Sequence, residues 1–254
     1  MIDMVVVNYR TPALLGRFLD SLAQYPPSET FSLVVVDVMP LSVGGWRVDH
    51  YVSTSENIGY NRACNIGAMV GTGDIIAFFN ADTAFSNSHC VDRCAEVLRS
   101  SSEVGVVGPL QVNERGQVTH AGVYGSFSER KEEGWKSPNP HLFTEDKTAL
   151  TVSGSAYFIK RSVWDELAGC SRAQDIDQGQ GAFLQTDHYF GETWCSFHAQ
   201  QHGYEVRYVG SASMIHTWHA SAKVGGYPEQ RFKEDQGTFI ASCESYLGGS
   251  NASE

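Results

Sequence analysis

The amino-acid sequence predicts an α/β fold built around a mostly parallel sheet, and three observations indicate it. Short apolar runs rich in Val and Ile, which are typical of buried strands, alternate with longer segments whose apolar residues recur at helical spacing. Repeated strand–helix–strand units favour parallel strands joined by right-handed crossovers. Polar residues that suit ligand binding stand at the ends of three expected strands, in Asn8-Tyr9-Arg10, at Asp37 and in Asn80-Ala81-Asp82.

The first third of the chain supplies most of the expected sheet. Large apolar residues between Leu14 and Leu22 repeat at helical spacing behind Pro12, which suits a first helical turn. Gly71 and Gly73 end the next helical pattern. In chain order we expect a strand at Met4–Val7, a helix beginning at Pro12, strands at Leu33–Val36 and Arg47–Val52, a helix at Asn57–Val70 and a strand at Asp74–Phe79.

The remaining two thirds of the chain are less regular. Ser126–Thr148 is polar and contains Pro138 and Pro140, so we expect a mobile loop there. Ala173–Gln185 has few large apolar side chains and is expected to be a second loop. The other expected elements are a helix at Cys90–Arg99, a strand at Val104–Val107, a hairpin at Leu110–Thr119, a strand at Thr151–Ile159, helices at Ser162–Leu167 and Glu192–His202, a strand at Tyr204–Val209 and a helix at Phe232–Leu247.

Composition excludes several classes of function. The chain has 254 residues, and its 18 Lys and Arg against 29 Asp and Glu give a net charge of -11. General nucleic-acid binding needs a basic surface and is not expected. We find no run of about 18–20 apolar residues that would span a membrane, and no basic, cleavable leader pattern. The six cysteines form no CxxC pair, so we expect reduced thiols and a cytoplasmic, water-soluble chain.

Asn80-Ala81-Asp82 is the sharpest local feature. Two oxygen-bearing side chains at positions i and i+2 of a strand end can face one cation, and carboxylate oxygens suit Mg²⁺ or Mn²⁺ bridging a diphosphate. The alternative is a turn that caps the next helix, because Asn and Asp serve both purposes. GxGxxG and GxxxxGK[ST] are both absent from the sequence, which disfavours a dinucleotide fold and an ordinary P-loop.

Two further candidates lie in the last third of the chain. His216 and His219 follow a β-like stretch at spacing i, i+3 and could share a metal, although such pairs are also common as surface or core histidines. Glu192 stands at a helix start, where its simplest interpretation is a first-turn acid favoured by the helix dipole. Taken singly, neither feature identifies a function.

Seven short segments occur in an order that, taken together, is far more specific than any one of them. Glu56–Gly67 is similar to the pattern NxGxxxAxNxG, and Phe78–Thr83 is similar to a DxD-type motif with Asn in the first place. The full set comprises Val5–Arg10, Glu56–Gly67, Phe78–Thr83, Val104–Pro109, Arg115–Gly122, Ser153–Arg161 and Gly203–Tyr208, closed by His216.

This ordered set resembles the inverting family-2 glycosyltransferases of the GT-A fold, and in particular their rhamnosyltransferase-like branch. The resemblance implies one GT-A domain over residues 1–254: a Rossmann-like, mostly parallel central sheet with a smaller acceptor-side β region. About 1–110 would bind the nucleotide sugar, and about 111–247 would form the acceptor side. It also implies a metal-dependent transfer of a hexosyl or deoxyhexosyl group to a hydroxyl group.

The resemblance assigns roles to particular residues of this chain. Asp82 and His216 would ligate Mn²⁺ or Mg²⁺, and Asp37 would hydrogen-bond the nucleobase. The general base would be Glu192, with Asp187 as the alternative, because the family's Glu-Asp-x-Asp stretch here reads Phe190–Cys195. The remaining donor contacts would come from Asn8, Tyr9, Arg10, Asn57, Arg62, Asn80, Ala81 and Lys223, or from Arg231 in place of Lys223.

The implied donor is a UDP-, dTDP- or GDP-linked sugar, and the implied acceptor is a saccharide or a protein. The altered Glu-Asp-x-Asp stretch leaves open a nucleotide-sugar-binding protein that has lost turnover. A nucleotidyltransferase on a similar fold is a further alternative, but it would need a Gly-rich, basic loop where Asn8–Pro12 stands.

Overall fold

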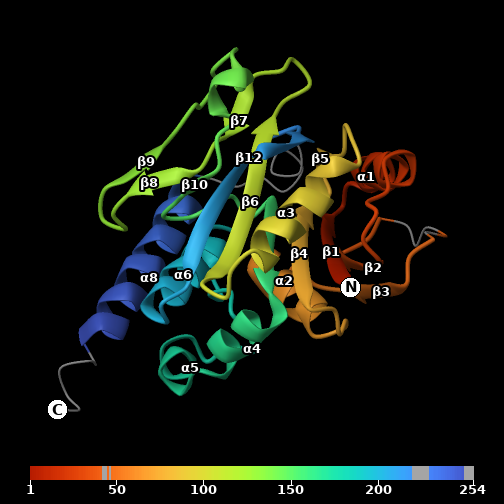
Figure 1. Ribbon diagram of the computed structural model, residues 1–254. Coiled ribbons are helices and arrows are strands. Elements are labelled where there is room, and N and C mark those ends of the chain that lie inside the picture. Colours follow the sequence, from red (N-terminus) through yellow and green to blue (C-terminus); the bar gives the residue numbers. More distant parts are fainter. Residues whose placement is uncertain (42–44, 46, 219–228, 249–254) are drawn as a thin grey trace.

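A ten-stranded sheet forms the centre of the computed structural model, which describes residues 1–41, 45, 47–218 and 229–248 (Figure 1). Along the sheet the main strands follow the order β10-β12-β6-β11-β4-β1-β2-β3, with β5 beside β12 and β7 beside β6. The strands are β1 (Ile2–Tyr9), β2 (Phe31–Val38), β3 (His50–Thr54), β4 (Ile75–Asn80), β5 (Thr83–Ala84), β6 (Val104–Val112), β7 (Val118–His120), β10 (Lys147–Thr148), β11 (Ala156–Lys160) and β12 (Glu205–His216).

Helices cover both faces of the sheet, and each strand contributes alternate residues to the two faces. Val5 and Val7 of β1 pack with α2 (Tyr60–Ala68), α4 (Arg161–Gly169) and α6 (Gly191–Gln201). Met4 and Val6 pack on the other face with α1 (Pro12–Gln24) and α3 (His89–Arg99). This period of two places β1 between two apolar layers and explains its continuous hydrophobic sequence.

The strand order places a crevice at the carboxyl ends of β1 and β4. β1 pairs in parallel with β2 on one side and with β4 on the other. The chain after β1 turns toward α1 and β2, whereas the chain after β4 turns toward β5, so the two connections diverge. Ligands of open α/β sheets bind at such a switch point.

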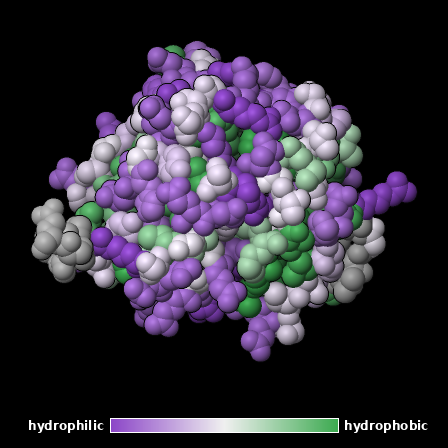
Figure 2. Space-filling view, turned by 60° about the horizontal axis from the view of Figure 1, so that its bottom comes forward, coloured by the Kyte–Doolittle hydropathy of each residue, from purple (hydrophilic) through white to green (hydrophobic). Residues whose placement is uncertain are grey.

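A third apolar cluster joins the last helix to the rest of the molecule. α8 (Glu229–Gly248) packs on α6 and on α5 (Ser171–Asp177) through Phe239, Cys243 and Tyr246 (Figure 1). On the face that Figure 2 draws, hydrophilic residues dominate and hydrophobic residues form separate patches. Among the described residues, no helix is both long enough and apolar enough to cross a membrane.

The two segments expected to be loops contain regular structure. Ser126–Thr148 includes β9 (Arg130–Glu132), which pairs with β8 (Val123–Gly125), a 3-10 turn at Pro140–Phe143, and β10. These short strands are held by backbone hydrogen bonds to a neighbouring strand, which need no apolar pattern. Ala173–Gln185 begins inside α5, where Ala173 is buried in the third apolar cluster.

Several element boundaries also differ from expectation. Asp37, expected at the end of its strand, is the second-last residue of β2, and β12 continues from Val209 to His216 beyond two register shifts. The strand expected at Thr151–Ile159 begins only at Ala156, because residues 153–155 form a turn in which the amide of Ala156 donates to the carbonyl of Ser153. The expected hairpin at Leu110–Thr119 is confirmed by the antiparallel pairing of β6 with β7.

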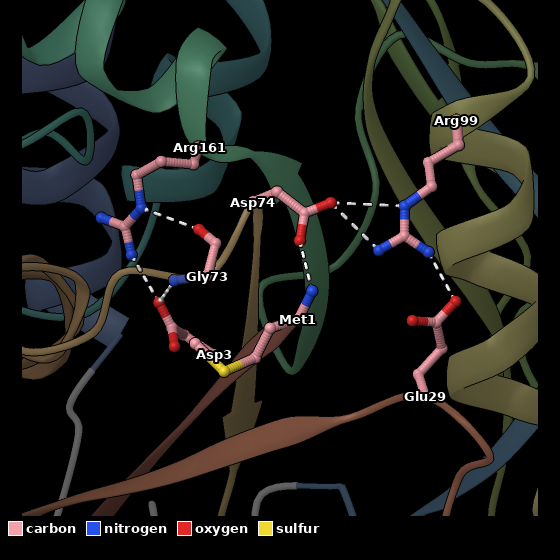
Figure 3. A network of polar contacts seen from close by, with 7 residues as sticks. All are labelled: Met1, Asp3, Glu29, Gly73, Asp74, Arg99 and Arg161. Atoms are coloured by element: carbon pink, nitrogen blue, oxygen red, sulfur yellow. Dashed lines mark hydrogen bonds and ion pairs between the residues drawn. The ribbon is translucent and has the colours of Figure 1, made fainter.

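A buried ion pair fastens the start of β1 to α4 (Figure 3). The side chain of Asp3 is fully buried, and its Oδ2 accepts hydrogen bonds from Arg161 at 2.8 Å and from the amide of Gly73 at 2.7 Å. In the same network, Arg99 pairs with Asp74 at 3.0 Å, but both side chains are largely exposed. Both arginines therefore pair with an aspartate, but the carboxylate is buried in the Arg161 pair and exposed to solvent in the Arg99 pair.

We expect Arg161→Met to lower the free energy of unfolding by about 3–5 kcal/mol, because it leaves the Asp3 carboxylate buried without its cation. Arg99→Met is the matched control and should cost about 0–1 kcal/mol, as exposed pairs do. Urea denaturation of the two variants measures the difference. Equal losses in the two variants would contradict the importance given to Asp3.

Candidate active site

The backbone brings Asp82 and His216 together from distant parts of the chain. β5 begins at Thr83 and pairs with the end of β12, so that Thr83 lies opposite His216. The amide of Thr217 donates to the carbonyl of Asp82 at 2.9 Å. As a result, Nε2 of His216 lies 3.5 Å from Oδ1 of Asp82, with both side chains buried. The two residues assigned to the metal from the sequence are therefore neighbours.

Hydrogen bonding sets the tautomer of His216. The hydroxyl of Ser155 donates to Oε1 of Gln111 at 2.7 Å, so its oxygen can only accept from Nδ1 of His216, 3.4 Å away. A proton on Nδ1 suits this contact, and it would direct the lone pair of Nε2 toward the Asp82 carboxylate. Two acceptors that face each other at this distance favour a cation between them.

The donor set fits a divalent metal ion. Oδ1 of Asn80, at the end of β4, is buried and accepts no hydrogen bond from any described residue. Ligands at right angles on a metal at about 2.1 Å lie about 3.0 Å apart, so a contraction of a few tenths of an ångström would let Asp82 and His216 share an ion. Carboxylate and amide oxygens suit Mg²⁺ and Mn²⁺, and the imidazole favours a transition metal.

Glu192 lines the same cavity as Asn80, Asp82 and His216. It is the second residue of α6, and its carboxyl group packs against Gly154, where a Cβ atom would lie 3.3 Å from Glu192. Burial raises the pKa of Glu192 above its ordinary value, and Arg130 only partly offsets this effect. A carboxylate with a raised pKa in a cavity is suited to accept a proton near neutral pH.

Close packing between α2 and α6 fixes the position of Glu192. A Cβ atom on Gly191 would lie 2.2 Å from Oδ1 of Asn61, so a larger residue could not follow Phe190 here. Gly59 approaches the carbonyl of Asp187 in the same way and has a positive φ of 79°, which suits glycine. The sequence thus requires glycine where these two helices begin.

Asp187, the alternative base, faces another way. Its carboxylate pairs with Arg231 of α8, and its side chain is 55% exposed. Asp187 is not among the residues that line the cavity with Glu192. Arg231, which the resemblance offers in place of Lys223 as a donor contact, therefore pairs with Asp187 here. Lys223 and His219 lie outside the described residues.

The residues assigned to the nucleotide form a polar network at the ends of β1 and β2. Asn8 donates to Oδ1 of Asp37 at 2.8 Å, and the hydroxyl of Tyr51 donates to Oδ2 at 2.9 Å. Burial and the Asp37 carboxylate raise the pKa of Tyr51 to about 12. The side chain of Asp37 is only 2% exposed, so in this conformation it joins three strands.

Beside this network lies an open cavity whose lining includes Arg10, Met39, Leu41 and Ser53. Arg10 and Met39 follow β1 and β2, and both have the left-handed φ that non-glycine residues rarely adopt. Backbone strain of this kind is common at ligand sites.

The other assigned donor residues are more scattered. Tyr9 packs against the core, and buried Ala81 donates its amide to the carbonyl of Val7. Asn57 is exposed and accepts from the amide of Gly59, while Arg62 is exposed near Asp177.

The sequence did not identify several residues of the cavity. Tyr60 begins α2 and donates to the carbonyl of Gly154 at 2.6 Å. His188 and Tyr189 belong to an aromatic run ahead of α6, which was the available signal for them, and Trp218 follows His216. Ser153 and Ser155 are part of the turn that replaces the start of the expected strand.

Comparison with solved structures identifies the fold. GalNAc-T7, crystallised with UDP, GalNAc and Mn²⁺, is 14% identical with a TM-score of 0.64 over 85% of this chain and 43% of its own. A mannosyltransferase from Pyrobaculum calidifontis with GDP-Man and Mn²⁺ is 14% identical with a TM-score of 0.59 over 100% of this chain and 75% of its own. Glucosyl-3-phosphoglycerate synthase from Mycobacterium tuberculosis, crystallised with Mn²⁺ and UDP, is 15% identical with a TM-score of 0.60 over 98% of this chain and 78% of its own.

No protein-family model and no curated protein matches the chain. The chain spans less than half of GalNAc-T7 and about three quarters of the other two enzymes. At these identities the likeness establishes the fold alone. The chain has the GT-A fold, a mixed α/β architecture with a large, mostly parallel central sheet.

Proposed function

We propose that the chain is a metal-dependent, inverting glycosyltransferase that moves a sugar from a nucleoside diphosphate to a hydroxyl group. The observation that carries this proposal is the cavity in which the Asp82–His216 pair and Glu192 meet at the switch point of the sheet. The GT-A neighbours were crystallised with UDP or GDP-Man and with Mn²⁺, which supports a nucleotide-sugar donor and a divalent ion. The ordered motifs favour family 2 and its rhamnosyltransferase-like branch.

In this proposal Asp82, His216 and Asn80 hold Mn²⁺ or Mg²⁺. Such an ion would neutralise the charge that develops on the departing nucleoside diphosphate. This chain needs a metal ion for that purpose because its net charge is -11 and it offers few cationic side chains to a doubly phosphorylated donor. The nucleobase of a UDP-, dTDP- or GDP-linked donor would lie next to Asp37, in the cavity whose lining includes Arg10 and Met39.

Glu192 takes the proton of the acceptor hydroxyl as its oxygen attacks the anomeric carbon. The bond from that carbon to the diphosphate breaks on the opposite face, so the configuration inverts. The acceptor, a saccharide or a protein, would reach the reaction past aromatic residues including Tyr60, His188 and Trp218, whose faces suit sugar rings. Residues from about 111 onward would then form the acceptor side. We also still expect the chain to be cytoplasmic.

The alternative is a donor-binding protein without turnover. The observation in its favour is that the second candidate base, Asp187, is paired with Arg231 and is not among the described residues that line the cavity, so of the two candidate bases Glu192 alone lines it. Incubation with UDP-, dTDP- and GDP-sugars and Mn²⁺ discriminates between the two functions, because a transferase releases nucleoside diphosphate and a binding protein does not.

Asp82→Asn should abolish the metal-dependent part of nucleotide binding. In the parent chain, nucleoside diphosphate at a hundredfold excess over its Kd with Mn²⁺ stabilises the fold by about 2.7 kcal/mol, measured as a thermal shift. The shift should vanish on addition of EDTA and in Asp82→Asn. Asp165→Asn, an exposed control on α4, should keep it. A full shift in Asp82→Asn would remove Asp82 from the site.

Glu192→Gln should lower kcat by about 10²–10⁴-fold while leaving donor binding intact. The same variant should be more stable than the parent at pH 8. The pKa of Glu192 is raised in the folded chain, so its ionisation destabilises the fold as pH rises through that pKa, and the neutral amide escapes this cost. Below pH 4.5 the two stabilities should converge.

The control for this test is Asp187→Asn, which alters an exposed carboxylate and should retain most activity. A fully active Glu192→Gln with an inactive Asp187→Asn would transfer the role of base to Asp187. Measurement of kcat and of urea denaturation across pH provides both comparisons.

The variant Asp37→Asn tests whether Asp37 binds the nucleobase of the donor or only connects neighbouring strands. If the Asp37 carboxylate contacts the nucleobase, the donor KM should rise about 10- to 100-fold with little change in kcat. Tyr51→Phe removes one internal partner of Asp37 without touching the carboxylate and should leave KM unchanged. A KM that responds equally to both variants would indicate that Asp37 only shapes the strand ends.

A further inference from the structure

A cluster of metal-binding side chains lies at the opposite end of α6 from Glu192. His198 and His202 stand one turn apart at the carboxyl end of this helix, and Cys170 stands at the junction of α4 and α5. One ligand atom from each of the three residues lies within 4.8 Å of the others. None of the three belongs to the cavity that holds Asp82 and His216.

His198 is a buried polar side chain without a hydrogen bond. Its exposed fraction is 0%, and neither Nδ1 nor Nε2 has a hydrogen-bond partner among the described residues. Its ring packs between those of Trp194, His202 and Tyr246. An unsatisfied buried nitrogen is costly, and a bound metal would satisfy it.

His202 is held in the orientation of a ligand. Its Nδ1 lies 2.7 Å from Oε1 of Glu166, and the hydroxyl of Tyr204 donates to the other oxygen of that carboxylate at 2.6 Å. A carboxylate that accepts Nδ1–H leaves the lone pair on Nε2, which is the usual arrangement around histidine bound to zinc. Nε2 faces the hydroxyl of Tyr246 at 3.3 Å, a long contact that a metal could replace.

We propose that Cys170, His198 and His202 form a second metal site, one that takes Zn²⁺ or a similar borderline transition metal. A thiolate with two imidazoles is a zinc-type donor set and a poor one for Mg²⁺. Tetrahedral geometry needs ligand atoms about 3.3–3.6 Å apart, so the side chains must close by about 1 Å. A water molecule completes the coordination, and binding releases the thiol proton of Cys170 to solvent.

The charges around the cluster permit a cation there. The guanidinium of Arg172 stacks over the ring of Tyr246 at 4.6 Å. Its positive charge repels a divalent ion at the cluster. The Cys170 thiolate and the Glu166 carboxylate supply two negative charges against it. The metal would join the α4–α5 junction to the carboxyl end of α6, whose amino end carries Glu192.

Cobalt substitution tests this site without relying on activity. The full chain, stripped of metal with a chelator, should bind Co²⁺ and develop the absorption of tetrahedral cobalt with a sulfur-to-cobalt charge-transfer band, which the sulfur-free Asp82–His216 pair cannot give. That band should disappear in Cys170→Ser and persist in Cys243→Ser, a control at a different free cysteine. Zn²⁺ at a hundredfold excess over its Kd should raise Tm by about 5–10 °C in the parent chain, and by much less in His198→Gln.

An independent measurement covers the case in which these variants fold poorly. X-ray absorption at the zinc edge of the parent chain should show a sulfur ligand at about 2.3 Å together with nitrogen or oxygen ligands at about 2.0–2.1 Å. Zinc with no sulfur ligand, a charge-transfer band that survives in Cys170→Ser, or a stripped chain that takes up no Co²⁺ would each overturn the proposal.

Discussion

The antiparallel pairing of β5 with the end of β12 is the constraint on which the candidate active site depends. Only two residues long, β5 is nevertheless what brings Asp82, which follows β4, against His216, more than 130 residues later in the chain. The pairing is made by backbone groups and holds the two residues side by side, and Nε2 of His216 lies 3.5 Å from Oδ1 of Asp82. A buried carboxylate oxygen beside an imidazole nitrogen is a pair of ligand atoms that suits a divalent cation.

The other half of the site depends on how the segment before α6 is anchored. Asn65 exchanges two hydrogen bonds with the backbone of Phe183, and Asn61 donates to Thr186 at 2.7 Å. These two asparagines belong to the motif that the sequence associates with the donor. In the structure they hold the segment leading to Glu192, so one motif couples the donor side of the cavity to the candidate base.

Much of this arrangement could be predicted from the sequence, because apolar runs and helical spacing report directly on burial. The order of β1, α1, β2, α2 and β4 and the placing of Asp82, His216 and Glu192 follow from such patterns and from the resemblance. The regular structure within Ser126–Thr148 could not be predicted, because β9 and β10 are held by backbone pairing that leaves no apolar pattern: β9 pairs with the short neighbouring strand β8, and β10 pairs with β12, which is distant in the sequence. The hydrogen bonds that Asp37 accepts from Asn8 and Tyr51 could not be predicted either, because only the folded sheet brings these three residues together.

The central claim is that Asp82 and His216 hold a metal ion that contacts a nucleoside diphosphate. Pulsed electron paramagnetic resonance of Mn²⁺ bound to the chain with UDP, dTDP or GDP tests it most directly. The account predicts coupling of the electron spin to one imidazole nitrogen and to phosphorus in the same complex, with the nitrogen coupling lost in His216→Gln. Mn²⁺ that couples to phosphorus alone, or a nitrogen coupling that survives in His216→Gln, would contradict it.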